Sequence, residues 1–141
     1  MSVASDLFYK YGINNVGISK IIQEAGVAKM TLYSHFDSKE DLIVNYLETR
    51  SREWVSWYGS QVYQIDLPPA DRLRNSFDVL ENWFRSKNYR GCLIANAVIE
   101  LANSNKRVLR VKKEYYSNIR KMYQDLANEA DYKNPVFIAE Q

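Results

Sequence analysis

The stretch Gly26-Val-Ala-Lys-Met-Thr-Leu-Tyr-Ser-His-Phe-Asp-Ser-Lys39 decides how the fold of this chain is interpreted. Leu32 and Phe36 stand four residues apart, so in a helix they share one face, and that face is predicted to be buried. The side chains around them are mostly polar and include the only histidine of the chain. Because burial needs only the apolar anchors, the polar outer face predicts a second role for this helix.

Another short helix is predicted directly before this stretch. Gly17 is a permissible N-cap, and Gly26 stands just past the end, where a left-handed residue closes many helices. The helix that follows is predicted to run from about Ala28 to Phe36. Two short helices joined by a tight turn form a helix-turn-helix, which places its second helix in the major groove of DNA. The buried face of the first of them is formed by Ile18, Ile21, Ile22 and Ala25.

The spacing of apolar residues is helical along the whole chain, which only five glycines and three prolines interrupt. The sequence therefore predicts an all-α protein. Ser38 and Asp41 form an imperfect capping box, which opens a long helix that ends near Tyr58. Residues 60–69, which end in Leu67-Pro-Pro69, are the predicted boundary between two modules.

Four apolar stripes and their flanking residues predict the other helices. Gly12 closes the first helix, Gly91 precedes a helix in the second half, and Ser104 caps a long helix near the C-terminus. Asn134-Pro135 ends that helix, and residues 136–141 begin another. The stripes are Val3, Leu7, Phe8 and Tyr11; Leu73, Phe77, Leu80 and Phe84; Leu93, Ala97 and Leu101 with Ile94 and Val98; and Val108, Val111, Tyr115, Ile119, Met122 and Leu126.

Length and composition narrow the class of protein. A chain of 141 residues holds one core, or a small module joined to a larger one, and 46% hydrophobic with 26% charged residues is typical of a folded protein. No apolar run reaches the ~20 residues of a membrane span, and no signal peptide is recognisable, so we expect a cytoplasmic protein without a membrane partner. One histidine and one cysteine, with no phosphate-binding glycine loop and no metal-ligand spacing, predict neither an enzyme nor a cofactor.

Charge does not by itself point to nucleic acid. Residues 1–50 carry five lysines and arginines against six aspartates and glutamates, a net charge of −1. A DNA-binding interpretation of this segment therefore depends on where single bases stand. Lys29 is one of them, because it lies at the N-terminus of the predicted recognition helix, where the helix dipole already favours phosphate.

Three motifs in the first 47 residues resemble a known family. They are Phe8-x-x-x-Gly12, Ile21-x-x-x-Ala25-Gly26-Val27 and Thr31-Leu-Tyr33-x-His35-Phe36-x-Ser38-Lys39-x-x-Leu42. Together they resemble the N-terminal domain of the TetR/AcrR family of bacterial transcriptional regulators. The resemblance implies a helix-turn-helix DNA-binding domain over residues 1–46. It also implies a helical domain over residues 47–141 that binds a small effector and forms a homodimer.

The resemblance assigns expected DNA contacts to four residues. Thr31, Tyr33 and His35 match positions that in the family contact DNA, mostly its backbone. Lys39 matches a lysine that binds phosphate from the start of the fourth helix. Without the family, His35 would more simply be a structural histidine at a helix end, and Tyr33 a ring that partly covers the core.

Four further positions complete the expected DNA-binding surface. Lys29, Met30 and Ser34 match variable positions that read bases. Ser19 stands where many members of the family carry an arginine that touches phosphate, so a weaker contact is expected there.

The chain also lacks the longer, basic first helix of the family and the two C-terminal helices that form its dimer. We therefore expect a sequence truncated at both ends.

The predicted C-terminal domain is rich in aromatic residues. Any one of them is more simply a core residue, but together they are numerous enough to line a pocket for an apolar or aromatic compound. Asn96 lies between two alanines in an apolar helix, so its amide needs a partner, and a ligand is one candidate. The predicted ligand-binding residues are Trp57, Phe77, Trp83, Asn96, Tyr115 and Ile119.

The sequence thus predicts a ligand-responsive transcriptional regulator that binds double-stranded operator DNA as a homodimer. It would be a repressor, released from its operator by a small apolar or aromatic effector. The alternative is a helical ligand-binding or protein-interaction module that no longer binds DNA. The net charge of −1 over residues 1–50 and the short first helix favour that alternative.

Overall fold

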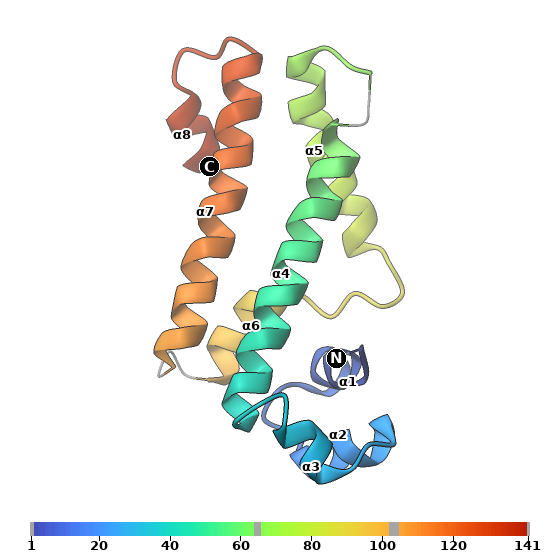
Figure 1. Ribbon diagram of the computed structural model, residues 1–141. Coiled ribbons are helices and arrows are strands. Elements are labelled where there is room, and N and C mark those ends of the chain that lie inside the picture. Colours follow the sequence, from blue (N-terminus) through green and yellow to red (C-terminus); the bar gives the residue numbers. More distant parts are fainter. Residues whose placement is uncertain (1, 64–65, 102–104, 141) are drawn as a thin grey trace. The chain divides into compact units, whose positions relative to one another are not determined.

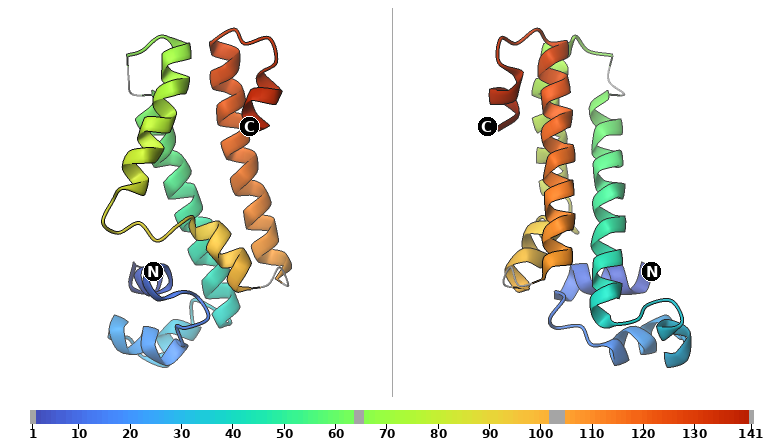
Figure 2. Two further views of the ribbon diagram at one scale, coloured as in Figure 1. Left: turned by 180° about the vertical axis from the view of Figure 1, so that it is seen from behind. Right: turned by 60° about the vertical axis from the view of Figure 1, so that its left-hand side comes forward.

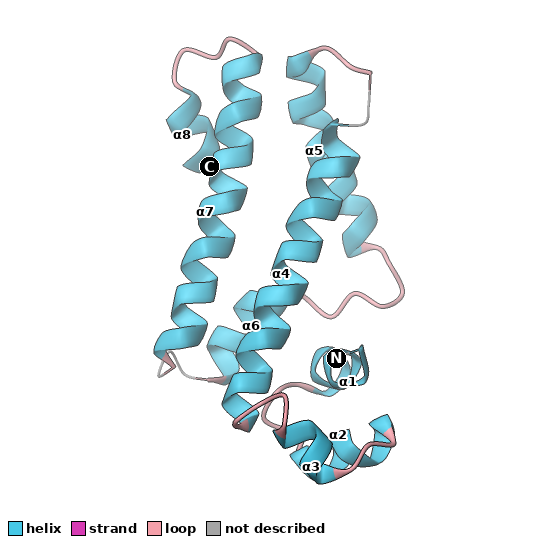
Figure 3. Cartoon of the chain, viewed as in Figure 1, coloured by secondary structure: helices cyan, strands magenta, loops and turns pink. Residues whose placement is uncertain are grey.

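The structure, a computed structural model, describes residues 2–63, 66–101 and 105–140, and every regular element within these ranges is a helix (Figure 3). The predicted all-α fold class is confirmed. The prediction that Ser104 caps a helix lies outside the described residues. In chain order the helices are α1 (Ser2–Tyr11), α2 (Ile18–Ala25), α3 (Lys29–Tyr33), α4 (Lys39–Tyr63), α5 (Pro69–Phe84), α6 (Leu93–Glu100), α7 (Lys106–Glu129) and α8 (Pro135–Glu140) (Figure 1).

Side chains cap the two longest helices at their N-termini. The Asp41 N–H donates to the Ser38 hydroxyl at 3.0 Å, which confirms Ser38 as the cap of α4. That helix continues past the predicted end at Tyr58 and reaches Tyr63. At the start of α7, the Asn105 side-chain oxygen accepts from the N–H groups of residues 107 and 108 at 3.0 and 3.1 Å. Asn105 therefore satisfies two of the N–H groups that a helix start leaves without partners.

The chain forms two compact units. Unit 1 comprises residues 1–51 and 90–112, and unit 2 comprises residues 52–89 and 113–141. The predicted boundary at residues 60–69 is wrong, because this segment lies inside unit 2. Proline and glycine content marks a loop, but a loop can connect two helices of the same unit. The predicted division between residues 46 and 47 stays a prediction.

Unit 1 has a mostly aliphatic core, with residues from α1, the loop after it, α2, α4 and α6. Phe8 packs against Tyr46 with ring centroids 5.3 Å apart, and both side chains are buried. Tyr11 was predicted to complete the inner stripe of α1, but it is 43% exposed. Lys20 lies over its ring, 4.0 Å from the centroid, so a cation rather than the core covers Tyr11. The core includes Leu7, Ile13, Val16, Ile21, Leu42, Val44, Leu47, Ile94 and Ala97.

Polar contacts in unit 1 join segments that are far apart in sequence. The Tyr9 hydroxyl accepts from the Arg90 N–H at 3.0 Å and donates to the Gly91 carbonyl at 3.3 Å. Asn14 donates twice to Glu100, from its N–H to the carboxylate at 2.9 Å and from its amide to the carbonyl at 2.7 Å. These bonds attach α1 and the turn after it to both ends of the α6 segment.

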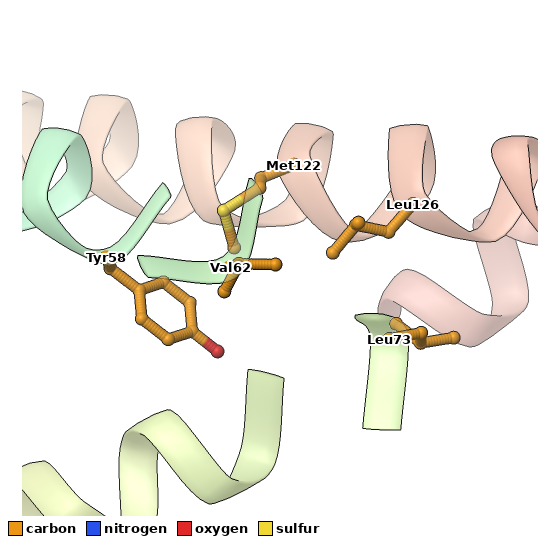
Figure 4. Close-up of a cluster of buried hydrophobic side chains, with 5 residues drawn as sticks. All are labelled: Tyr58, Val62, Leu73, Met122 and Leu126. Carbon is orange, nitrogen blue, oxygen red and sulfur yellow. The ribbon is translucent and has the colours of Figure 1, made fainter. Parts of the chain in front are cut away.

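Unit 2 is built from the C-terminal halves of α4 and α7 together with α5 and α8 (Figure 2). Its core is a cluster of five buried residues (Figure 4). Tyr58 is fully buried, and its hydroxyl donates to the Ser76 carbonyl at 2.9 Å and lies 2.6 Å from the Tyr123 hydroxyl. The five residues are Tyr58, Val62, Leu73, Met122 and Leu126.

The predicted inner stripe of α5 is partly wrong. Leu73 is buried as expected, but Phe77 is 61% exposed and Phe84 is exposed. The inner position is taken by Ser76, which is fully buried and donates its hydroxyl to the Leu73 carbonyl at 2.6 Å. A small residue at this position leaves room for the Tyr58 phenol. The buried face of α5 therefore includes Ser76 in place of Phe77.

Candidate functional site

The turn at Gly26 sets the direction of the third helix. Gly26 is left-handed (φ 65°, ψ 27°), and its N–H donates to the Gln23 carbonyl at 3.3 Å. Ala28 is extended and is the N-cap residue of α3. A Cβ added at Gly26 would meet no atom within 4 Å, so the backbone conformation alone favours glycine. The predicted helix-turn-helix is present over α2 and α3.

The third helix is shorter than predicted. It was expected to run from Ala28 to Phe36, but α3 spans only Lys29–Tyr33. The Ser34 hydroxyl donates to the Thr31 carbonyl at 2.8 Å, so a side chain takes part in closing the last turn. The N–H groups of His35 and Phe36 both donate to the Leu32 carbonyl at 3.1 Å. His35 therefore lies in the turn after the helix.

The outer face of α3 is open to solvent. None of its residues is buried, and Met30 is 85% exposed. The predicted DNA-binding residues from α3 and the turn after it lie close together in sequence and are all exposed: Lys29, Met30, Thr31, Tyr33, Ser34 and His35. Ser19 is also exposed, on α2. This face is available to a partner.

The inner face of α3 lies over a cavity of about 300 Å³ between α1, α2, α3 and α4. Leu32 and Phe36 line it, which confirms the direction in which they were predicted to point. They are only partly buried, however, so the helix is held less tightly than full burial would hold it. Thr31 and His35 line the same cavity.

The lysines expected to bind DNA have different surroundings. Lys29 is exposed, with its Nζ 5.9 Å from the centroid of the Tyr33 ring. Lys39 is partly buried, and its Nζ donates to the Ile13 carbonyl at 3.0 Å. This bond fixes the first residue of α4 to the loop between α1 and α2. A phosphate contact by Lys39 would have to replace it.

The charge of unit 1 differs from that of its first 50 residues. Residues 90–112 add five lysines and arginines and one glutamate. Unit 1 as a whole therefore has ten basic and seven acidic residues, a net charge of +3. Arg107 donates to the Asp41 carboxylate at 2.6 Å, which raises the pKa of Arg107, since the carboxylate favours the charged guanidinium. The fold thus pairs acids of α4 with bases that are distant in sequence.

Five of the six predicted ligand-binding residues lie in unit 2, namely Trp57, Phe77, Trp83, Tyr115 and Ile119. Trp54, which was left out of that set, lies at the centre of their aromatic cluster. Its ring stacks on Tyr58 at 4.9 Å and lies 5.2, 5.8 and 6.4 Å from the rings of Trp83, Tyr115 and Trp57. The buried Nε1 of Trp54 has no hydrogen-bond partner among the residues that the structure describes. Its spacing from Trp57 and Tyr58 on one helix was the signal that could have placed it there.

Asn96 does not belong to this aromatic cluster, because it lies in unit 1. Its amide needed a partner, and that partner is the Arg90 carbonyl, to which it donates at 2.8 Å. The side chain also fills the space beside Gly91, where a Cβ would lie 3.1 Å from the amide nitrogen. Asn96 therefore holds the turn before α6, its amide has the partner that was predicted to be needed, and a contact with a ligand stays a prediction.

Two other kinds of feature are absent from the described ranges. No helix there is long and apolar enough to cross a membrane. The described histidine, cysteine, aspartate and glutamate side chains form no group that could hold a metal ion.

Residues 1–46 match the family of bacterial regulatory proteins, tetR family. The chain is 24% identical over 122 residues to an uncharacterized HTH-type transcriptional regulator in the lacX 3' region of Lactococcus lactis subsp. lactis, covering 86% of this chain and 62% of that protein. It is 28% identical over 98 residues to the HTH-type transcriptional repressor DhaR of Mycobacterium sp. (strain GP1), covering 70% of this chain and 48% of that one. The chain thus spans about half to three fifths of these relatives' lengths.

Solved structures give the same picture of the fold. A TetR-family transcriptional regulator from Streptomyces coelicolor superposes with a TM-score of 0.88 at 27% identity, over 99% of this chain and 73% of that one. The reduced form of NemR from E. coli has the same fold, with a TM-score of 0.85 at 17% identity, over 99% and 77% of the two chains. Residues 1–46 thus match the tetR family, and the chain as a whole has the fold of TetR-family transcriptional regulators.

Proposed function

We propose that this chain is part of a ligand-responsive transcriptional regulator that binds operator DNA as a homodimer in the cytoplasm. One observation carries the proposal. Directly after the left-handed turn at Gly26, α3 exposes a polar face without a buried residue, within the segment that matches the tetR family. A helix that buries so little of its surface within the protein is expected to bind a partner.

In the proposed complex α3 enters the major groove of operator DNA. Lys29, Met30 and Ser34 face base edges, while Thr31, Tyr33 and His35 contact the sugar-phosphate backbone. Backbone contacts position the protein, and base contacts choose the sequence. The recognition helices of a dimer must lie ~34 Å apart to enter successive grooves on one side of the duplex.

The net charge of +3 on unit 1 supports this proposal over a module that has lost DNA binding. Each phosphate that a protein neutralises releases counterions, so binding weakens as salt rises. Lys39 contributes only if its ammonium leaves the Ile13 carbonyl, which it contacts at 3.0 Å. Lys29 needs no such exchange, so we expect it to be the more important cation.

A salt titration with DNA tests the proposal. Fluorescence anisotropy would follow binding of the 141-residue chain to random-sequence duplexes and to a duplex selected from them by binding. We expect Lys29→Gln, which removes a positive charge brought into the groove, to lower the slope of log K against log salt by about 1 and to change which duplex is preferred. Lys113→Gln is the matched control, because Lys113 is an exposed lysine of unit 2, and its slope should equal that of the unchanged chain.

Base reading is tested by repeating the selection with variants. Met30→Ala and Ser34→Ala should change which duplexes are enriched, because each removes an exposed side chain from the outer face of α3. If the unchanged chain enriches no sequence and shows no salt-dependent binding, the proposal is wrong and the helical module without DNA binding replaces it.

The proposed effector is a small apolar or aromatic molecule that binds in unit 2 and releases the operator, so the regulator acts as a repressor. Support comes from the unpartnered Nε1 of Trp54 within an aromatic cluster, since a buried donor favours a ligand with a hydrogen-bond acceptor. All three tryptophans lie in unit 2, so their fluorescence should report binding. Naphthol and naphthalene are suitable probes. Equal affinity for both would contradict the role of Trp54.

A further inference from the structure

A second cavity in unit 1 has no part in the proposed DNA contacts. Its volume is about 210 Å³, and it lies between α1, α4 and the segment that begins at Arg90 and includes α6. The volume that a water occupies in the liquid is about 30 Å³, so a space of this size admits several waters or one small organic molecule. Its walls come from three separate parts of the chain.

A buried phenol lines this cavity without a hydrogen bond. Tyr46 is only 2% exposed, and no hydrogen bond found among the described residues involves its hydroxyl. The other tyrosine of the cavity, Tyr9, already binds the backbone at Arg90 and Gly91. Burial raises the pKa of Tyr46 to about 12, so its hydroxyl keeps its proton at neutral pH and is a donor. A hydroxyl that lines the cavity and has no acceptor in the described part of the protein is free to donate to a ligand there.

Charges of both signs surround the same cavity. Lys10 and Arg90 line it, and so does Glu100. Among the described residues no ion pair joins these three side chains. The Glu100 carboxylate accepts one hydrogen bond, from the Asn14 N–H at 2.9 Å, and it has further lone pairs to offer. A molecule that carries both charges would satisfy the walls on both sides.

We infer that this cavity binds a small zwitterion of the size of glycine or alanine. The Tyr46 hydroxyl and the Lys10 ammonium receive its carboxylate, and the Glu100 carboxylate receives its ammonium. The ligand would contact α1, α4 and α6 at once, so its binding stabilises the arrangement of these helices in unit 1. Any effect on DNA binding would follow by linkage, but the site does not depend on the proposed function.

Four probes separate the possible chemistries. Isothermal titration of the 141-residue chain would use glycine and L-alanine as zwitterions, acetate as the carboxylate alone and methylammonium as the cation alone. We expect saturable binding of glycine or L-alanine, at least about tenfold tighter than that of either half, because only the zwitterion engages both signs of charge. Binding of acetate as tightly as glycine would identify an anion site and overturn the inference.

Variants test the residues involved. Tyr46→Phe keeps the ring that packs on Phe8 and removes only the hydroxyl, so we expect about tenfold weaker binding of glycine. Lys10→Gln should also weaken it. Lys20→Gln is the matched control, because both lysines are exposed and lie over the Tyr11 ring, at 5.0 and 4.0 Å, yet only Lys10 lines the cavity.

Two results would refute the site. One is the absence of saturable heat with all four probes, and the other is equal glycine affinity of Lys10→Gln and Lys20→Gln. The lysine pair decides the question even if Tyr46→Phe does not fold, because both lysines are on the surface. DNA binding measured in parallel keeps the two proposals apart. Loss of probe binding with intact DNA binding concerns this site alone.

Discussion

The interactions that stabilise unit 1 internally differ from those that stabilise unit 2. In unit 1, hydrogen bonds from Tyr9 and Asn14 reach across more than 80 positions of sequence to the α6 segment. In unit 2, the rings of Trp54 and its neighbours pack on one another at 4.9 to 6.4 Å. Their net charges also differ, with +3 on unit 1 and nine basic against ten acidic residues, or −1, on unit 2.

The two units therefore differ in how strictly their internal contacts fix the positions of the helices. Polar bonds have strict geometry, so they fix the register of α1 and α6, whereas the contacts between rings are less directional. The difference is also convenient to measure. All three tryptophans lie in unit 2 and the only histidine, His35, lies in unit 1. Tryptophan fluorescence and the His35 NMR signal therefore report on the two units separately.

The largest effect is expected for Tyr58→Ala in unit 2. Tyr58 is fully buried, stacks on Trp54 and contacts both Ser76 and Tyr123 through its hydroxyl. Its removal leaves a cavity and two polar groups without this partner, so we expect the free energy of unfolding to fall by about 4 kcal/mol. Denaturant unfolding followed by tryptophan fluorescence would measure it.

Tyr63→Ala is the control, because Tyr63 lies on the same helix but is exposed. Its substitution should cost less than about 1 kcal/mol. Similar losses for the two variants would show that the aromatic cluster does not determine the stability of unit 2.

The next effect concerns Tyr46, the buried phenol of unit 1. Burial, the largest cause, raises its pKa from 10.0 to about 12. Between pH 10 and 12 the phenol ionises in the unfolded chain but not in the folded one, so stability falls as pH rises through this range. The loss should reach about 3 kcal/mol near pH 12, and none of it is present below pH 10. Unfolding of the unchanged chain and of Tyr46→Phe, measured from pH 8 to 12, isolates this contribution. Parallel pH curves would contradict it.

Much of this architecture was predictable from local sequence. The turn at Gly26 and the cap at Ser38 each depend on a few neighbouring residues, and the structure has both where they were predicted. The helical stripes predicted the helices, although Tyr11, Phe77 and Phe84 are exposed. The exposed outer face of α3 was likewise predictable, because Leu32 and Phe36 fix which side points inward.

Contacts between distant segments were not predictable from local spacing. The pairing of Arg107 with Asp41 and the bond from Lys39 to Ile13 depend on the fold. For the same reason, the charge of residues 1–50 gave too acidic a view of the unit that contains α3. The burial of Ser76 was not predicted because serine is not hydrophobic. Ser76 is buried because its small side chain fits beside the phenol of Tyr58.

Two glycines of unit 1 have the same backbone requirement but different surroundings. Gly12 and Gly26 both have positive φ, 86° and 65°. A Cβ on Gly26 meets nothing within 4 Å, so Gly26→Ala should cost about 1 kcal/mol, from backbone strain alone. A Cβ on Gly12 would lie 3.0 Å from the Glu100 carboxylate, so Gly12→Ala should cost about 2 kcal/mol.

A double-mutant cycle with Glu100→Ala tests the cause of that difference. Shortening Glu100 removes the crowding, so Gly12→Ala should then cost no more than Gly26→Ala. An unchanged cost of Gly12→Ala in the Glu100→Ala background would mean that the polar attachment of α1 to α6 plays no part in it. Unfolding followed through the His35 signal reports on this unit.

The smallest changes in stability are expected for two asparagine side chains that cap helices, one in each unit. Asn105 accepts from two backbone N–H groups at the start of α7, and its neighbour Val108 is buried in unit 1. Asn105→Ala should therefore lower the free energy of unfolding by about 1 kcal/mol. Asn134 accepts from one N–H, of Phe137, at the start of α8, a six-residue helix without a buried residue. Asn134→Ala should cost less than about 0.5 kcal/mol, since α8 contributes only the partly buried Ile138 to the core of unit 2. Hydrogen exchange distinguishes the two variants, because only Asn105→Ala should speed the exchange of buried amides. A larger loss of stability for Asn134→Ala than for Asn105→Ala would show that α8 contributes more to unit 2 than its burial indicates.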